Sequence, residues 1–444
     1  MRIRQPDISP PETVPDFSSS KRSKIYKVVT ITPISGGGVE TGVPDRDLPI
    51  RATAIRGQLR YWWRFLVSHR KENPVKDHKK LLEQERALWG GIGDKNRGFA
   101  SKLIVRVRNV PTTRTEPCYK YTPNGTKDNG KPKYKEDFLH NIPPYALFSG
   151  KGKKPCDRST PPKPEEIPVE VILNGLKFTF EVSSLGDKLT DTEWNTVLEA
   201  VRWWANFGGI GARTRRGLGS VAIEGIEPLT DQDVEVFGCK LKKLGETSDA
   251  VEAWNRCITK LQSFRQGKDI GRRSGSGKKL GRSYWPEADS IRLITGKNAN
   301  GKHHPINTSG TFPRAAFGLP IIFDFNVPPP VGEPPKTELS SASENYERMA
   351  SPLFLKAQYI GEKRFLPIAL CLPAKHLRTL KVQLKCVESS HSDLPKTLAC
   401  ENQDVWWPKD EDRQKDLVAD IKPLRNRGND ALSAFMHYFS ENNS

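Results

Sequence analysis

Apolar residues recur at helical spacing in two long stretches of this chain. The first stretch covers residues 51–70, where Thr53 stands at the expected N-cap. The second begins at Asp191, and Thr190 and Glu193 have the spacing of a capping box. Shorter helices are predicted at residues 78–89, 254–264 and 430–440. The chain is therefore expected to contain several amphipathic helices, each burying one face.

Alternating apolar residues predict strands between these helices. The clearest local pattern lies at residues 169–182, where two alternating runs flank Asn174-Gly175. Both central residues of the tight turn favoured in hairpins must accept positive φ, so this dipeptide predicts a β-hairpin. Further strands are predicted at residues 25–32, 102–110, 218–223, 321–327, 352–360, 364–372 and 381–387.

The first half presents these elements in the order strand, helix, strand, hairpin strands, helix, strand. This order is close to the βαββαβ plan of ferredoxin-like folds, which RNA-recognition modules often use, although the plan alone does not establish a function. Residues 111–168 interrupt it with eleven prolines and many lysines, which excludes a continuous helix or a central strand. We predict that this segment is an insertion or thumb, with residues 145–148 as its apolar anchor.

Length and charge narrow the possible functions. At 444 residues, two or three domains are expected. The chain has 71 Lys and Arg residues against 52 Asp and Glu residues, a net charge of +19, which favours nucleic acid ahead of an anionic membrane surface as the partner. No apolar run approaches the ~18 residues of a membrane-spanning helix, so no membrane partner is expected.

The N-terminal residues and the cysteines favour a cytoplasmic protein. Residues 1–23 are rich in proline, serine and charge, lack the apolar core of a signal peptide, and are predicted to be a flexible tail. The seven cysteines form no CxxC pair, which excludes zinc-ribbon and dithiol redox motifs. Reduced and mostly buried thiols are expected.

A stripe of arginines adjoins the apolar stripe of the first long helix. Arg56, Arg60 and Arg64 are spaced at i, i+4 and i+8, and residues 51–70 contain no acid. Like charges at this spacing destabilise a helix by roughly 0.2–0.5 kcal/mol per pair, so an anionic partner is expected to compensate them. The planar, forked guanidinium is well suited to phosphate.

Two glycine-rich basic loops are further candidates for a polyanion contact, with a solvated turn as the alternative. The loop at residues 208–220 contains no acid, so glycine N–H groups and arginines could meet a phosphate together. Thr214 breaks a GxGxxG motif there, and Ser276 breaks a Walker A motif in the second loop, residues 270–286, so neither is a known nucleotide cradle. The candidate contact residues are Arg56, Arg60, Arg64, Gly209, Gly211, Arg213, Arg215, Arg216, Arg272, Arg273, Lys278 and Lys279.

Aromatic and histidine residues add weaker candidates. Trp62-Trp63 and Trp203-Trp204 could stack on bases, but burial in the core is favoured for most of them because tryptophan buries a large area. His69 and His303-His304 could act as general acid and base, yet nothing at a fixed spacing supports a catalytic site around them. The isolated aspartates form no recognisable metal pair, so no catalytic residue, metal or cofactor is predicted.

Several sequence blocks stand out over about residues 25–372. They are TPISGGG (32–38), IRATAIRGQLRYWWRFL (50–66), ExxLWG (85–90), GGIGARTRRGLGS (208–220), GRSYWPEADSIR (281–292), FPRAAFGLPIIFDF (312–325) and RMASPLFLK (348–356). In this order the blocks resemble the RAMP superfamily of CRISPR proteins. Within it they look most like the first RAMP subunit of the type III-B (Cmr) effector complex.

The resemblance implies an α+β protein with two ferredoxin-like domains packed together. We assign these domains to residues 24–225, with 111–168 as the Pro/Lys-rich insertion, and to residues 226–444. It also implies a place beside guide RNA, target RNA and other Cmr subunits in an antiviral defence complex. Target cleavage in such complexes belongs to a different, backbone-forming subunit, so a non-catalytic RNA-binding role is expected.

Two alternatives remain open from the sequence. One is a metal-independent RAMP endoribonuclease that processes guide-RNA precursors, with His69 or His304 as its general base. The other is a purely structural subunit whose basic face meets acidic partner proteins.

Overall fold

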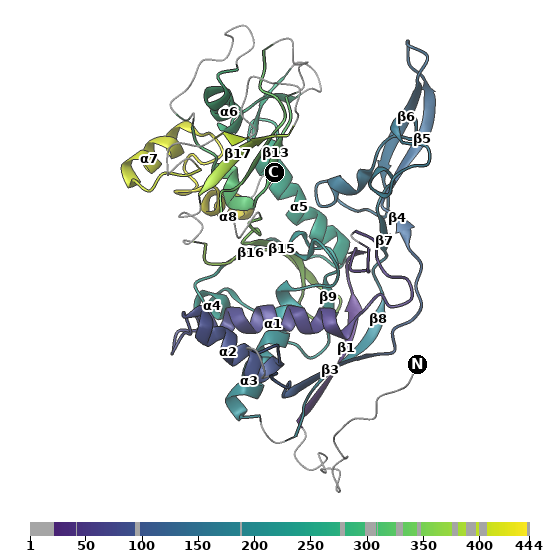
Figure 1. The fold of residues 1–444 in the computed structure, drawn as a ribbon, viewed down its shortest axis with the longest axis vertical. Coiled ribbons are helices and arrows are strands. Elements are labelled where there is room, and N and C mark those ends of the chain that lie inside the picture. Colours follow the sequence, from purple (N-terminus) through teal and green to yellow (C-terminus); the bar gives the residue numbers. More distant parts are fainter. Residues whose placement is uncertain are drawn as a thin grey trace, which may run out of the picture.

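The structure is a computed structural model with mixed helices and antiparallel sheets (Figure 1). It describes residues 22–40, 42–93, 98–186, 189–275, 280–297, 308, 310–325, 332–343, 348–374, 381–387, 397–398 and 406–441. The predicted tail therefore lies almost entirely outside the described residues. In the described part, no helix is both long and apolar enough to cross a bilayer.

The first half is built on a four-stranded antiparallel sheet. Its strands are β1 (Ser23–Thr30), β3 (Leu103–Arg108), β8 (Lys177–Ser184) and β9 (Val221–Ile223), in the spatial order β3-β8-β1-β9. Helices α1 (Ala52–His69) and α3 (Asp191–Phe207) pack together and share a core with this sheet. Tyr26 and Val28 of β1 are buried and Lys27 between them is exposed, as expected for a strand with one face against helices.

The long helices follow the apolar periodicity of the sequence. Trp62-Trp63 on α1 and Trp203-Trp204 on α3 are all buried, which confirms the predicted preference for the core. The capping box of α3 is present, with the Thr190 hydroxyl accepting from the N–H of Glu193 at 3.2 Å. The predicted N-cap of α1 is wrong, because the helix already begins at Ala52 and places Thr53 inside its first turn.

The predicted Asn-Gly hairpin is also wrong, because the strands on either side of the turn belong to different sheets. β7 (Glu170–Ile172) pairs with β2 (Ile34–Ser35) and β4 (Glu116–Pro117), whereas β8 pairs with β1 and β3. Gly175 has the expected positive φ of 96°, but its N–H donates to the carbonyl of Thr30 at the end of β1. The turn therefore directs the chain from one sheet to another.

The proline-rich segment 111–168 contains no α-helix, and the structure describes all of it. Its strands β5 (Tyr119–Thr126) and β6 (Pro132–Phe138) pair only with each other and form a projecting hairpin (Figure 1). Three short 3₁₀ turns follow, η1 (Phe148–Lys151), η2 (Pro155–Asp157) and η3 (Pro164–Glu166). The absence of a continuous helix and of a central strand is as the prolines predicted.

The second half contains two further antiparallel sheets. The first has the order β10-β16-β15, from β10 (Lys240–Lys243), β15 (Leu353–Tyr359) and β16 (Phe365–Cys371), and packs against α5 (Ala250–Gln266) and α8 (Ala431–Ser440). The second has the order β13-β14-β17-β18, from β13 (Ile321–Phe323), β14 (Thr337–Ser341), β17 (Val382–Cys386) and β18 (Thr397–Leu398). The remaining helices are α2 (His78–Trp89), α4 (Asp231–Glu235), η4 (Thr214–Arg216), α6 (Glu287–Thr295), η6 (Pro313–Phe317) and α7 (Glu411–Asp420).

The second basic loop is not a plain loop. β11 (Arg272–Ser274) and β12 (Leu280–Ser283) pair within it as a two-stranded ribbon. The alternation that would have predicted these strands is obscured by glycine, which is depleted in strands.

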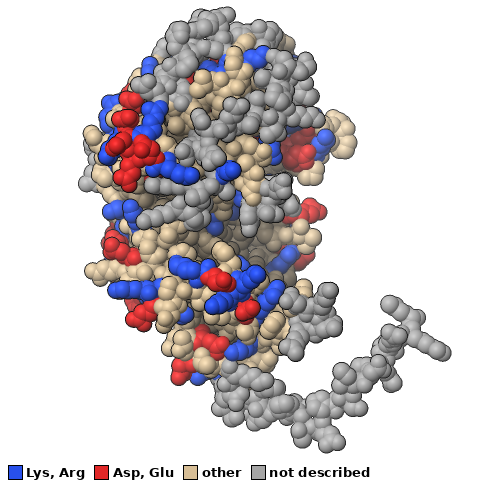
Figure 2. Space-filling model, turned by 60° about the vertical axis from the view of Figure 1, so that its left-hand side comes forward, with Lys and Arg blue, Asp and Glu red and all other residues tan. Residues whose placement is uncertain are grey.

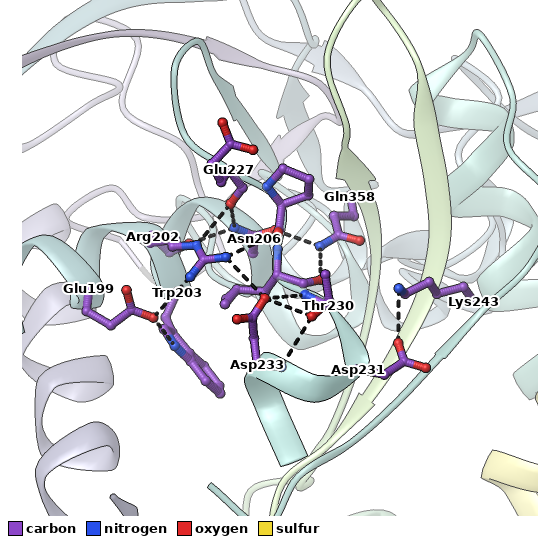
Figure 3. Close-up of polar contacts among 12 residues, drawn as sticks. Glu199, Arg202, Trp203, Asn206, Glu227, Thr230, Asp231, Asp233, Lys243 and Gln358 are labelled. Atoms are coloured by element: carbon purple, nitrogen blue, oxygen red, sulfur yellow. Dashed lines mark hydrogen bonds and ion pairs between the residues drawn. The ribbon is translucent and has the colours of Figure 1, made fainter. Parts of the chain in front are cut away.

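The two halves are joined by shared cores and by a buried polar cluster. Phe354 and Ile368 of the second half belong to the core around α1 and α3, and Ala222 of β9 belongs to the core of the second half. Figure 3 shows the polar cluster, in which the side-chain oxygen of Asn206 on α3 accepts from the amide of Gln358 on β15 at 2.6 Å. The same oxygen accepts from the N–H of Leu229 at 3.0 Å, so helix, loop and strand are fixed together.

Candidate nucleic-acid interface

The arginine stripe on α1 has part of its anionic partner inside the protein. Arg60 and Arg64 lie 2.7 Å and 3.4 Å from the two carboxylate oxygens of Glu85 on α2. The Glu85 side chain is 1% exposed, while those of Arg60 and Arg64 remain 32% and 47% exposed. The stripe therefore holds α2 in place and still presents cationic groups to solvent.

Arg56 completes the contact between the same two helices. Its guanidinium donates to the carbonyl of Trp89, the last residue of α2, where the helix dipole favours a cation. Burial, with a contribution from the neighbouring Arg60, lowers the pKa of Arg56. The segment 85–90 was singled out in the sequence as a family block, and it is the segment that docks on the stripe.

The first glycine-rich loop uses its backbone N–H groups internally. The N–H groups of Ile210, Ala212 and Gly219 donate to the carbonyls of Gly219, Ser35 and Pro33 at 2.6–2.9 Å. The glycines permit close packing. A Cβ on Gly211 would lie 2.6 Å from the Ser35 carbonyl oxygen. A Cβ on Gly209 would similarly lie 2.9 Å from the carbonyl oxygen of Gly219.

The end of this loop is the point where the first half meets α5. Trp254 donates its indole N–H to the carbonyl of Arg216 at 2.6 Å, and a Cβ on Gly217 would lie 2.5 Å from the Trp254 ring. The Gly217 carbonyl in turn accepts from the Thr32 hydroxyl at 2.6 Å. Glycine at position 217 is therefore required by the junction itself.

Four arginines gather at this junction, and we call Arg213, Arg215, Arg216 and Arg265 the junction arginine cluster. Arg215 donates to the carbonyl of Ser351 at 2.8 Å, and its guanidinium lies 5.0 Å from the centre of the Phe354 ring. Arg213 donates to the Ser149 hydroxyl and to the Ala146 carbonyl, beside the predicted apolar anchor of the thumb. The loop, the segment 111–168 and the second half thus all contribute residues to one basic site.

No carboxylate of the described residues forms an ion pair with this cluster. Burial and the nearby Arg265 lower the pKa of Arg216 to about 10, and burial lowers the pKa of Arg265. An Nη of Arg216 and the Nε of Arg265 are buried and have no hydrogen-bond partner. Cation–π contacts offset part of the free-energy cost of burying these unpaired groups, because the Arg265 guanidinium lies over the rings of Tyr145 and Phe317.

The remaining predicted contact residues lie on the β11–β12 ribbon. Arg272 is half-buried, and exposed Arg273 lies 5.7 Å from the centre of the Tyr284 ring. Lys278 and Lys279 are outside the described residues. Among the described residues, no hydrogen bond or ion pair joins Arg272 or Arg273 to the junction arginine cluster, although Gly271 beside the ribbon packs against the backbone of Arg265.

The described part of the structure shows no catalytic arrangement around the candidate histidines. The His69 ring is stacked on Phe65 at 4.5 Å, with its Nδ1 close to the Ser68 hydroxyl and the Phe65 carbonyl oxygen. His303 and His304 lie outside the described residues. Within the described residues no group of three or more His, Cys, Asp or Glu side chains could hold a metal.

Two buried cations at the junction were missed in the sequence. Lys356 on β15 is fully buried, donates to the Gly208 carbonyl, and burial lowers its pKa to about 7. Arg265 lies on α5, in a stretch that the sequence predicted only as an amphipathic helix. Lys356 could have been suspected from its place at the end of the block 348–356, within an otherwise apolar strand pattern.

Three of the sequence blocks, 32–38, 208–220 and 348–356, meet at this junction although they are far apart in the sequence. Gly37 packs on Gly211, Ser351 accepts from Arg215, and Lys356 donates to Gly208. Two further blocks meet where Arg314 pairs with buried Glu287 at 3.1 Å. On the face shown in Figure 2, lysines and arginines occur over both halves and are interrupted by acids.

Part of the chain is similar in sequence to known proteins. Residues 27–222 match the sequence model of the RAMP superfamily. The CRISPR system Cmr subunit Cmr1-2 of Pyrococcus furiosus is 25% identical over 201 residues, 45% of this chain and 94% of that relative.

Two solved structures are also similar. Apo Cmr1 from Pyrococcus furiosus is 14% identical, covers 79% of this chain and 87% of its own length, and has a TM-score of 0.39. A chain of the type III-B Cmr-beta complex bound to cognate target RNA and AMPPnP is 12% identical, with coverage of 79% and 94% and a TM-score of 0.43. Residues 27–222 are therefore similar to the RAMP superfamily, and part of the chain is similar to the Cmr subunit Cmr1-2.

Proposed function

We propose that this chain is a non-catalytic RNA-binding subunit of a type III-B CRISPR effector complex, acting in antiviral defence. The similarity to Cmr1-2, which is named as a subunit of a Cmr system, supports the place in the complex. Guide RNA, target RNA and other Cmr proteins are the proposed partners, in the cytoplasm.

The junction arginine cluster is the observation that carries this proposal. Buried N–H groups without acceptors cost roughly 1–3 kcal/mol each, and more when the group is charged. Arg216 and Arg265 both carry such groups, and no described carboxylate pairs with them. A phosphodiester would supply the missing acceptors and the missing negative charge together.

Phosphate contacts also suit the proposed role in a guide-RNA complex. They give affinity without reading sequence, as befits a complex whose specificity comes from guide pairing. In this proposal Arg213 and Arg215 contact phosphates beside Arg216, while Arg60 and Arg64 contribute through the part of each side chain that Glu85 leaves exposed. Gly209 and Gly211 shape the loop, and Arg272, Arg273, Lys278 and Lys279 extend the contact onto the ribbon.

We further propose that both halves are ferredoxin-like domains, residues 24–225 with the insertion 111–168 and residues 226–444. In the first half, strands one to four of a βαββαβ unit correspond to β1, β3, β8 and β9, and their spatial order supports this assignment. In the second half β10, β15 and β16, with α5 and α8, correspond to the first three strands and both helices. None of the described strands takes the fourth position.

Binding of the full chain to single-stranded RNA at several salt concentrations tests the proposed function. If about six phosphates are neutralised, the logarithm of the association constant should fall with the logarithm of salt at a slope near −4. The double variant Arg216→Met, Arg265→Met keeps the packing volume, and it should bind RNA more weakly with a slope smaller in magnitude by about one per lost contact. Arg364→Met, at a surface site paired with Glu246, is the matched control.

A folded double variant with unchanged affinity and slope would refute this role of the cluster. The non-catalytic part of the proposal is tested separately, by incubating the protein with labelled precursor RNA in a chelator. Specific cleavage that is lost in a His69→Ala or His304→Ala variant would establish the endoribonuclease alternative instead.

A further inference from the structure

A pocket of about 580 Å³ lies between the first sheet and the end of the β15–β16 hairpin. Its volume is within the ~300–1,000 Å³ range of small-molecule sites. Val28 and Phe178 point into the core around α1 and α3, whereas Val29 alternates to the opposite face. The pocket is therefore on the face of the sheet that α1 and α3 leave uncovered.

Three lysines from three different segments line this pocket. They are Lys27 on β1, Lys177 on β8 and Lys363 in the turn between β15 and β16. All three are exposed, and no described carboxylate forms an ion pair with any of them. Glu224 is the one acid in the lining, so the pocket has a net positive charge.

The interior of the pocket is apolar and contains an aromatic ring. Val29, Ile31 and Ala222 line one side, and Tyr359 and Phe365 line the other. Tyr359 is half-buried, and its ring centre lies 5.7 Å from that of Phe365, with the two rings tilted by 47°. An aromatic face of this kind can stack on any nucleobase.

The polar part of the lining can hydrogen-bond to the edge of a base. The Asn109 side-chain amide donates to the Thr179 hydroxyl at 3.3 Å, which leaves the second amide hydrogen and the carbonyl oxygen of Asn109 for a ligand. Asn109 is exposed at the end of β3. A flat apolar ring system with polar edges and an attached anion matches all these features.

We propose that this pocket binds a nucleobase of single-stranded RNA, stacked on Tyr359, with its phosphate beside Lys27, Lys177 and Lys363. The proposal deepens the proposed function by adding a base-binding subsite. None of the pocket residues belongs to the junction arginine cluster, so the two sites can be tested separately. The same chemistry would accept a free nucleotide, and the experiment separates that source from an RNA strand.

The experiment cross-links the full chain to polyuridine that carries 5-iodouridine and maps the linked peptides by mass spectrometry. Cross-links are expected at Tyr359 and to be lost in Tyr359→Ala, whose RNA affinity should fall about fivefold or more, the equivalent of one stacked base. Lys363→Ala should weaken binding and reduce the salt slope. Tyr359→Phe, which keeps the ring, and Lys79→Ala, an exposed lysine on α2, should bind like the wild type.

Cross-links that all map outside the pocket, together with unchanged RNA affinity of a folded Tyr359→Ala variant, would overturn the subsite. If RNA binding were nevertheless lost in the Arg216→Met, Arg265→Met variant, the proposed RNA-binding function would stand without the base-binding subsite. If the wild type bound no RNA, saturable binding of labelled uridine monophosphate that is lost in Tyr359→Ala would retain the pocket as a free-nucleotide site. No saturable binding of either probe would refute it.

Discussion

The buried carboxylate of Glu85 determines which contacts the arginines of α1 make. Glu85 is the internal counter-ion of Arg60 and Arg64, so these residues serve the α1–α2 contact before they serve any ligand. A single carboxylate does not neutralise two guanidinium groups, and both arginine side chains remain partly exposed. The same residues therefore hold the fold and retain a positive surface.

Replacing Glu85 should separate these two roles. Glu85→Gln leaves two cations beside an uncharged group, and we expect it to lower the free energy of unfolding by about 1–3 kcal/mol, less than for a fully buried pair because both arginines are partly exposed. The change also releases Arg60 and Arg64 and should increase affinity for RNA at low salt. Urea denaturation and RNA titration measure the two effects.

Glu83→Gln provides the control, because Glu83 is exposed on the same helix. It should change stability by less than about 0.5 kcal/mol. Equal stability of the two variants would contradict the role assigned to Glu85.

Lys356 makes stability depend on pH. Burial lowers the pKa of its amine in the folded protein to about 7, from an ordinary value of 10.5. Between these values the unfolded chain binds a proton that the folded chain does not, so stability should rise with pH across this window. Below about pH 7 both states are protonated and the cost of the buried charge is complete.

Lys356→Met should therefore stabilise the protein most near and below neutral pH, by about 1–4 kcal/mol, and less as the pH approaches 10. The lost hydrogen bond to Gly208 offsets about 1 kcal/mol of this gain. Urea denaturation of wild type and variant across this pH range measures the difference. Lys240→Met, at an exposed position on β10, should show no such trend.

At the scale of elements, the glycine-rich loop at residues 208–220 is basic and also joins neighbouring segments through close backbone packing. Its N–H groups bond to the segment around Pro33 and Ser35, and Gly217 leaves room for Trp254 of α5. The arginines of the loop are thereby held at fixed positions, since the backbone that carries them is bonded on both sides. A preorganised cluster loses little entropy when it binds a ligand.

Gly217 and Gly225 form a matched pair for testing this packing. Both have positive φ, 85° and 75°, but a Cβ would lie 2.5 Å from Trp254 at position 217 and in open space at position 225. Gly225→Ala should cost about 1–2 kcal/mol from the left-handed backbone alone. Gly217→Ala should cost about 1–3 kcal/mol more, from overpacking, and should weaken RNA binding, as measured by thermal denaturation and RNA titration.

At the scale of the whole molecule, the cores do not follow the division into two halves. Phe354 on β15 packs against Trp62 of α1 with ring centres 5.4 Å apart, and Ile368 and Leu370 of β16 belong to the same core. Arg215, Lys356 and Gln358 add polar contacts across the junction. Neither half can expose its side of this interface without uncovering a core.

The two halves should therefore unfold together. Far-UV circular dichroism and near-UV circular dichroism are expected to report coincident urea transitions. Phe354→Ala should shift both transitions by the same amount, corresponding to about 3–5 kcal/mol. Two separated transitions, or a shift of only one of them, would show that the halves are independent.

The sequence alone determined the features that depend on near neighbours. The long helices, the α3 capping box and the burial of the paired tryptophans follow from periodicity and from side chains three or four residues apart. The basic character of the protein and the motif blocks were equally visible. All of these are properties that a short window of residues carries by itself.

Tertiary structure decided which partners these elements took. Gly175 took the expected positive φ but Asn174 did not, and β8 paired with β1 and β3 instead of with β7. The counter-ion of the arginine stripe came from another helix, and Arg265 joined the loop arginines from the second half of the chain. Strand pairing, charge compensation and burial depend on residues that are far apart in sequence. These interactions contribute to stability only after folding has brought those residues into contact.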